Sequence, residues 1–122
     1  MPSRERVRAF VATVEAGRFV EAIETYYADD ASMQENLAPP RRGKAALVSH
    51  ERAVLAAHTT ARALPGSLWL IEGERVAIRW VFEMVRPGGA VMRLDEVALQ
   101  LWRDDLIIEE RFYYDPGHMK RT

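Results

Sequence analysis

Cysteine is absent from this 122-residue sequence. That absence excludes disulfide bonds, thiol catalysis and thiolate metal sites. An excess of charge of one sign is also lacking, because 17 Lys and Arg residues stand against 18 Asp and Glu residues and leave a net charge of −1. Nucleic acids and acidic membrane surfaces are held by a surplus of positive charge. We therefore expect neither as a partner.

Long apolar runs are lacking too. No run approaches the roughly 18 residues that span a membrane, and the N-terminus has no apolar centre like that of a signal peptide. We therefore expect a cytoplasmic protein. What the sequence does contain is 48% hydrophobic and 29% charged residues, an ordinary balance for a globular protein. A chain of this length forms one domain with a real core, predicted over residues 1–122.

Apolar residues at helical spacing predict three helices in the first half of the chain. These helices span residues 2–17, 18–27 and 44–57. Ser3 is suited to cap the first helix and Gly17 to end it. The second helix carries Tyr27 on the same face as Phe19 and Ile23, and the Asp29–Asp30 pair is expected to break it.

Alternating residues predict strands elsewhere. The predicted strands are 31–36, 58–73, 74–86, 90–102 and 106–115, with an irregular proline-containing connection at 37–43. Pro65–Gly66 is expected to put a bulge or bend into the strand at 58–73. This order of elements predicts an α+β fold, with three N-terminal helices packed on a curved, mostly antiparallel sheet.

Three stretches carry a family resemblance when they are taken in order. They are "AGRFVEAIETYYADDASMQEN", "PPRRGKAAL" and "LQLWRDDLIIEERFYYD". Together they resemble the nuclear transport factor 2-like superfamily, and within it the SnoaL-like and ketosteroid isomerase-like families, over nearly the whole chain. The resemblance implies a single SnoaL-like domain with a cystatin-like cone fold. Its apolar cavity is expected to open to solvent and to hold a small hydrophobic molecule.

The resemblance also implies a base. Ketosteroid isomerases take a proton from carbon with a carboxylate and hold the enolate with a tyrosine and a protonated aspartic acid. The base of the ketosteroid isomerases aligns with Glu35, although Asn36 stands where those enzymes have proline. Their tyrosine aligns with Phe10 and their protonated aspartate with Ala98. Because neither residue can donate a proton, we do not expect steroid isomerase activity.

Two further carboxyl groups are candidates for proton transfer. If Ala98 points inward as aligned, Glu96 and Gln100 point inward too, and so do Glu110, Phe112 and Tyr114 on the last strand. Carboxyl groups that share an apolar cavity raise one another's pKa and can supply an acid and a base. The predicted catalytic residues are therefore Glu35, Glu96 and Glu110.

An opposite orientation of the strand at 90–102 stays open. Val97, Leu99 and Leu101 are its more apolar set, and if they faced the core Glu96 would face water. In this superfamily the outer sheet face often carries a dimer interface, which accounts for apolar residues on both faces. We therefore expect a homodimer through that face.

The predicted ligand-binding residues form the wall of the cone. They are Phe10, Tyr26, Met33, His58, Trp80, Phe82, Ala98, Gln100, Phe112 and Tyr114. For these aromatic residues an ordinary core is the favoured alternative, and it is compatible with a pocket wall. For His58 the favoured alternative is a structural hydrogen bond. His50 is expected to face solvent and His118 to lie in the tail, so the histidines show no metal-ligand spacing. The basic run "PPRRGK" is typical of a solvated loop, the alternative being attraction of an anionic group.

Two functions follow. The first is a small hydrophobic-ligand-binding protein, acting as an isomerase, cyclase or hydrolase on an apolar carbonyl or epoxide compound, without cofactor or metal. The second is a non-catalytic dimeric module whose pocket is filled. The volume of the cavity separates the two.

Overall fold

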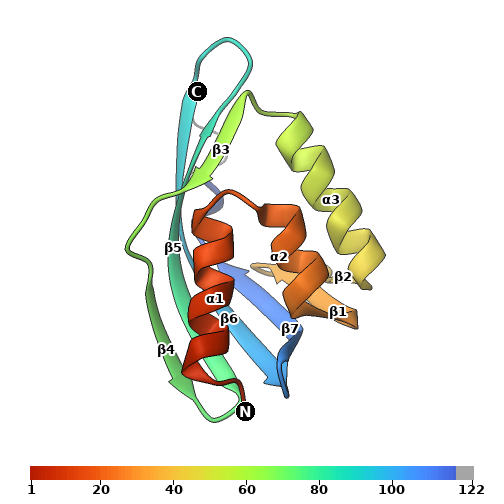
Figure 1. Cartoon of the computed structure of the whole chain (residues 1–122). Helices are drawn as coiled ribbons and strands as arrows, with labels where there is room; N and C mark the ends of the chain where they lie inside the picture. Colours follow the sequence, from red (N-terminus) through yellow and green to blue (C-terminus); the bar gives the residue numbers. More distant parts are fainter. Residues whose placement is uncertain (118–122) are drawn as a thin grey trace.

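The computed structural model describes residues 1–117, which form three helices against one face of a curled seven-stranded sheet (Figure 1). The helices are α1 (Arg4–Glu15), α2 (Phe19–Tyr26) and α3 (Lys44–Ala56). The strands are β1 (Tyr27–Glu35), β2 (Arg41–Arg42), β3 (Thr60–Ala63), β4 (Leu68–Glu72), β5 (Arg75–Val85), β6 (Val91–Arg103) and β7 (Leu106–Tyr113). The predicted α+β cone is confirmed.

The sheet is a meander of β5, β6 and β7, and β1 extends it beside β7. Its order is β2-β1-β7-β6-β5-β3, and β4 also pairs with β5. β1 pairs with β7 in parallel, and the other pairs are antiparallel. β3 and β4 lie along the same edge of β5, with Ala63 opposite Phe82 and Leu68 opposite Arg79. The predicted interruption at Pro65–Gly66 is the short connection between them.

The first helix begins and ends as predicted. The Ser3 side chain accepts a hydrogen bond from the Arg6 backbone N–H at 3.0 Å. Gly17 follows the helix with φ of 82°, a conformation that glycine adopts at little cost. α3 also matches its predicted range to within one residue at its C-terminal end.

The second helix ends earlier than predicted, and the strand after it begins earlier. Tyr27 is the first residue of β1 and pairs with Ile107, so its placement on the helix was wrong. The helix has therefore ended before Asp29 and Asp30, which lie exposed inside the strand. The parallel pairing with β7 shifts register between Tyr27 and Ser32, and this irregularity accommodates the two aspartates at the surface.

The connection between β1 and α3 contains a strand that alternation did not predict. β2 has only two residues, and Arg41 pairs with Met33 of β1. Gly43 follows the strand, and its backbone N–H donates to the carbonyl oxygen of Ala31.

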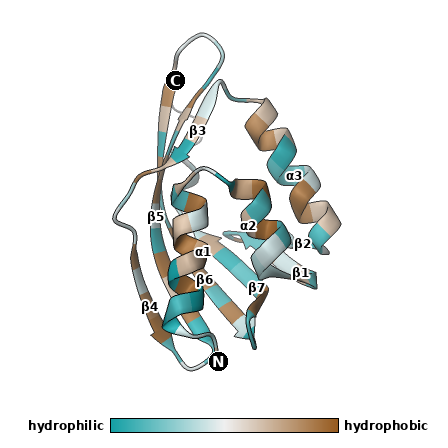
Figure 2. Ribbon diagram, in the orientation of Figure 1, coloured by the Kyte–Doolittle hydropathy of each residue, from teal (hydrophilic) through white to brown (hydrophobic). Residues whose placement is uncertain are grey.

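The inner face of β6 carries the side chains of Glu96 and Gln100, as the family alignment predicts. Glu96, Ala98, Gln100 and Trp102 are buried, whereas Val97 and Leu99 on the other face are 42% and 37% exposed. The orientation that placed Glu96 in water is therefore wrong. Alternating hydrophobic and hydrophilic residues are visible along the sheet strands (Figure 2).

The core lies between the inner face of the sheet and the helices. Phe10 of α1 is at its centre, and its ring contacts four other aromatic rings edge to face at centroid distances of 5.4 to 6.2 Å. These rings belong to Tyr26, Tyr27, Trp80 and Trp102. No helix within residues 1–117 combines the length and apolarity needed to cross a membrane.

Candidate functional site

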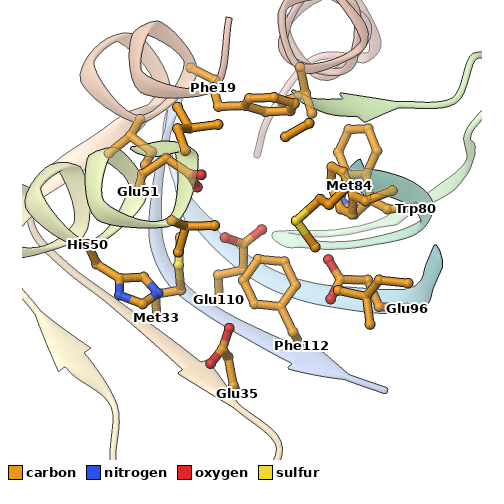
Figure 3. A pocket seen from close by; sticks show the side chains of 18 of the residues that line it. Phe19, Met33, Glu35, His50, Glu51, Trp80, Met84, Glu96, Glu110 and Phe112 are labelled. Atoms are coloured by element: carbon orange, nitrogen blue, oxygen red, sulfur yellow. The ribbon is translucent and has the colours of Figure 1, made fainter. Parts of the chain in front are cut away.

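A cavity of about 240 Å³ lies between the helices and the inner face of the sheet. Its wall is mainly aliphatic and aromatic, with carboxyl groups entering from several elements (Figure 3). This volume is just below the roughly 300–1,000 Å³ typical of drug-sized ligands, so the cavity suits a compact molecule. Trp80, Phe82 and Phe112 form part of the wall and leave this space open between them.

Most of the predicted site residues line this cavity. These are Phe10, Met33, Glu35, Trp80, Phe82, Glu96, Glu110, Phe112 and Tyr114. The structure brings the three predicted catalytic carboxyls to one space, from β1, β6 and β7. Whether they are catalytic stays a prediction.

Four predicted ligand-binding residues do not line the cavity: Tyr26, His58, Ala98 and Gln100. Tyr26 faces α1, where the Arg6 guanidinium lies 4.3 Å from its ring centroid. His58 Nδ1 lies 2.7 Å from the carbonyl oxygen of Val54. This contact is the structural hydrogen bond that was the alternative role for His58. Ala98 is fully buried. His118 lies outside the described residues.

Gln100 lies behind the wall and holds Glu110. Its amide nitrogen donates to Glu110 Oε2 at 2.6 Å, and its amide oxygen accepts from the Trp102 indole N–H at 2.9 Å. The indole thereby fixes which way the amide points, because an indole N–H can only donate. The hydroxyl group of Tyr27 donates to Glu110 Oε1. Each carboxyl oxygen of Glu110 therefore has its own donor.

A bulge in β7 brings Glu110 to this position. Arg103 pairs with Leu106 and Trp102 with Ile107 next to the turn, so a regular hairpin would place Glu109 opposite Gln100. The register shifts by one residue between Leu101 and Trp102, and Glu110 pairs with Gln100 instead. Because a one-residue slip reverses the face of each side chain, this bulge turns Glu110 inward and Glu109 outward.

Burial raises the pKa of Glu110 to about 7, although the hydrogen bonds from Gln100 and Tyr27 pull it down. Burial also raises the pKa of Tyr27 well above its usual value, and the neighbouring charge of Glu110 adds to this effect. Near neutral pH, Glu110 therefore exchanges a proton readily while Tyr27 keeps its own.

Glu96 is the second buried carboxyl. It is 5% exposed, and within residues 1–117 its side chain has no hydrogen bond or ion pair. Burial first, then the charges of Glu110, Glu35 and Glu51, raise its pKa to about 8. Glu96 is therefore mostly protonated at neutral pH.

Glu35, the residue predicted to align with the base of ketosteroid isomerases, lies in a wetter environment. Its side chain is 37% exposed and lies 3.7 Å from the Arg41 guanidinium. In Figure 3 it sits at the edge of the site, below Met33 and His50. Glu35 thus has a countercharge and water, whereas Glu96 and Glu110 are enclosed.

Comparison with known proteins assigns the family. The family model of the SnoaL-like domain matches residues 7–110. The chain belongs to the SnoaL-like domain family. No curated protein matches it as a sequence relative.

Solved structures of SnoaL-like proteins share the fold. A proposed SnoaL-like polyketide cyclase of Mesorhizobium loti is 26% identical, with a TM-score of 0.76 over 93% of this chain and 100% of the other. A proposed polyketide cyclase of Xanthomonas campestris pv. campestris is 19% identical, with a TM-score of 0.80 over 94% and 91%. TerC, co-crystallised with polyporic acid, is 20% identical, with a TM-score of 0.78 over 94% and 92%.

The SnoaL-like cavity also contains residues that sequence reasoning missed. Tyr27, His50 and Glu51 line it, so the prediction that His50 faces solvent was wrong. Burial and then the Arg41 charge lower the pKa of His50, whereas burial raises that of Glu51. Both precede lining residues of α3 by four positions, since Val54 and Leu55 also face the cavity. That spacing was the signal that could have placed them.

Asn36 shows why the family's proline is absent from this SnoaL-like chain. Its φ of 49° is one that the proline ring cannot adopt. Its side-chain oxygen accepts from the Tyr114 backbone N–H at 3.0 Å, and its own N–H donates to the Phe112 carbonyl at 2.8 Å. Asn36 thus ties the end of β1 to the end of β7, beside the cavity residues Phe112 and Tyr114.

The donor set offers no metal centre in the described part of the chain. Among residues 1–117, no three His, Asp or Glu side chains come together in a way that could hold a metal ion. The carboxyl groups surround the cavity and do not converge on one point (Figure 3).

Proposed function

We propose that this protein binds a small hydrophobic molecule in its cavity and transfers protons on it with buried carboxyl groups. The observation that carries this proposal is Glu110, a carboxyl on an apolar wall that is oriented by one donor on each oxygen. A general base works best when its pKa is near the working pH, and Glu110 has a pKa of about 7.

The reaction we propose is isomerisation, cyclisation or hydrolysis of a small apolar carbonyl or epoxide compound. Glu110 accepts a proton from carbon or from water, and a protonated carboxyl returns one to oxygen. Glu35 and Glu96 are the other two carboxyls proposed to take part. The proposed cyclase activity of the Mesorhizobium loti relative supports this class of reaction, and the co-crystallisation of TerC with polyporic acid supports an organic ligand.

The test is the change Glu110→Gln, with Glu109→Gln as matched control. Glu109 is the exposed neighbour on the same strand, so the control removes the same charge outside the cavity. Small carbonyl and epoxide compounds are screened for binding and turnover by NMR, including exchange of protons beside the carbonyl with solvent deuterium. We expect Glu110→Gln to bind these compounds but to lose about a hundredfold or more in rate.

Two results would contradict the proposal. The first is wild-type turnover in Glu110→Gln. The second is a cavity that takes up none of the compounds, with no difference between wild type and Val54→Trp, a change that fills the cavity from α3.

A second candidate function is a non-catalytic dimeric association module. The open cavity disfavours a module whose pocket is filled by side chains. The outer face of the sheet nevertheless favours association. Outward residues form cross-strand rows there, Leu70–Ala77–Leu99 and Leu68–Arg79–Val97–Tyr113. Leu68 and Leu70 are 63% and 65% exposed.

We propose that a second copy of this chain covers these rows as a homodimer. Such a face suits a two-fold interface, because its exposed apolar residues stand beside Arg79 and Asp95, which form an ion pair at 2.6 Å. Light scattering at micromolar concentration should give a dimer mass, and Leu99→Glu should give a monomer. A monomer mass for the wild type would contradict this proposal without affecting the cavity.

A further inference from the structure

The charged side chains that line the cavity are of one sign. Four carboxyls line it, and among residues 1–117 no Lys or Arg does. They are Glu35, Glu51, Glu96 and Glu110. The composition of the chain does not account for this bias, because 17 basic residues nearly balance 18 acidic ones. The cavity therefore gathers acidic groups inside a nearly neutral protein, and its negative field grows as these groups lose their protons with rising pH.

Glu96 is the carboxyl that the protein itself leaves without a partner. Glu110 has two hydrogen-bond donors and Glu35 has Arg41. Glu96 is as enclosed as Glu110, yet it has no such contact in the described part of the chain. Burying an unpartnered carboxyl costs stability. Such a group beside a cavity is a candidate for a contact with a ligand.

Aromatic rings adjoin this carboxyl. Trp80 is the cross-strand neighbour of Glu96, and its ring centroid lies 5.7 Å from that of Phe82. Figure 3 shows the Glu96 carboxyl near Trp80 and Met84, with Phe112 beside it. Ammonium groups are attracted to carboxylates and to the faces of aromatic rings. A lone carboxyl among such rings therefore recognises a positively charged group on an apolar body.

We propose that the ligand of this cavity is a hydrophobic amine, whose ammonium group lies against Glu96 and whose apolar body lies along the aromatic wall. This inference rests on the proposed function, because it uses the same cavity, and it adds the charge of the molecule. For such a ligand Glu96 holds the ammonium group instead of transferring a proton, and proton transfer is left to Glu110 and Glu35.

Several titratable groups face Glu96 from the elements around the cavity. They are Tyr27 and Glu35 of β1, His50 and Glu51 of α3, Glu110 of β7, and Tyr114 after β7, with Arg41 of β2 beside Glu35. Because the pKa of Glu96 is about 8, a cationic ligand must displace its proton at lower pH. A primary ammonium keeps its own proton to about pH 10, as lysine does. Affinity for an amine should therefore rise by up to about tenfold per pH unit until pH 8.

The experiment compares three probes that share one aromatic body. Tryptamine carries an ammonium, 3-propylindole carries a methyl group in its place, and indole-3-propionate carries a carboxylate. Dissociation constants are measured by isothermal titration calorimetry on the full chain at pH 6.5 and 8.5. We expect tryptamine to bind most tightly at pH 8.5 and indole-3-propionate to bind least. Glu96→Gln should weaken tryptamine by about 30-fold or more while 3-propylindole is unaffected.

Glu109→Gln is the control for the loss of one negative charge outside the cavity. It should leave the affinity of all three probes near that of the wild type. The pH comparison uses the unaltered protein, so the result does not depend on folding of the Glu96 variant. Tryptamine that binds no tighter than 3-propylindole, or more weakly at pH 8.5 than at pH 6.5, overturns the amine inference and leaves the proposed cavity binding intact. A cavity that takes up none of the probes overturns the amine inference, and the screen of carbonyl and epoxide compounds then decides on the proposed function separately.

Discussion

Charged side chains have different surroundings on the two faces of the sheet. On the outer face, Glu83 lies between Arg62 and Arg93 at 2.9 Å from each, and Arg79 pairs with Asp95. On the inner face, Glu96 and Glu110 are buried, and no Lys or Arg within residues 1–117 pairs with either of them. Paired surface charges are typical of a solvated sheet. Enclosed carboxyls beside a cavity need another explanation, and we propose that a ligand supplies it.

The largest contrast between the faces should appear in packing. Ile78→Ala on the inner face removes a fully buried side chain and should lower the free energy of unfolding by about 2–5 kcal/mol. Leu70→Ala on the outer face of the neighbouring strand should change it by about 0.5 kcal/mol or less in the monomer. Urea denaturation measures both. Equal losses would mean that the outer face is packed in solution, as in a dimer.

The next contrast is in pH dependence. The pKa values of Glu96 and Glu110 are raised from 4.5 to about 8 and about 7. The unfolded chain therefore loses these protons at lower pH than the folded chain does, and the stability that they contribute falls as the pH rises from about 4.5 to 8. We expect thermal denaturation to show a lower Tm at pH 8.5 than at pH 5.5.

Glu96→Gln isolates the inner face in this experiment. This variant should lose most of the decline in Tm with rising pH. It should also be more stable than the wild type at pH 8.5 by a few kcal/mol, on the order of 1.4 kcal/mol per unit of pKa shift removed. An unchanged pH profile in this variant would mean that Glu96 is solvated, and the contrast between the two faces would disappear.

A smaller effect is expected from the residue behind the cavity wall. Gln100→Leu removes a donor from Glu110 and an acceptor from the Trp102 indole, and should cost about 1–3 kcal/mol of stability. Because the hydrogen bond from Gln100 lowers the pKa of Glu110, its loss should raise that pKa further. NMR titration of the carboxyl carbon reports this shift, and Glu109 provides an internal reference. A pKa that stays in place would show that Gln100 does not hold the carboxyl.

The smallest effect is expected on the outer face. Asp95→Asn breaks the exposed pair with Arg79 and should barely change the Tm at low salt. Any change should vanish in concentrated salt, because exposed charges are screened there. A large loss that persists in salt would place this pair in a buried interface.

The sequence predicts the inner face of the sheet well, because strand alternation is a local pattern. It places Val76, Ile78 and Trp80 together on β5, and with the family alignment it turns Glu96 and Glu110 inward. It does not reveal that Gln100 holds Glu110, because that contact depends on the bulge in β7. A bulge is a property of paired strands and leaves no pattern in either strand alone.

The helical half is harder to predict at its junctions. Tyr27 fits the helical spacing of Phe19 and Ile23, yet it belongs to β1, because pairing with Ile107 outweighs local preference. Glu51 is a polar residue on a helix and is normally assigned to water. Its position is set by the cavity beneath α3, and a cavity is a property of the whole fold.

The parallel pairing of β1 with β7 has a consequence for how the protein acquires its site. Tyr27 and Glu110 are 83 residues apart in the chain, so their contact closes a loop that spans most of the molecule. Contacts of such long range form slowly, since the chain must lose much of its freedom before they stabilise it. On the ribosome, β1 can pair with β7 only after this last strand has emerged. The chemistry of the cavity is therefore assembled last, and a chain that stops before β7 lacks the carboxyl that we propose to transfer protons.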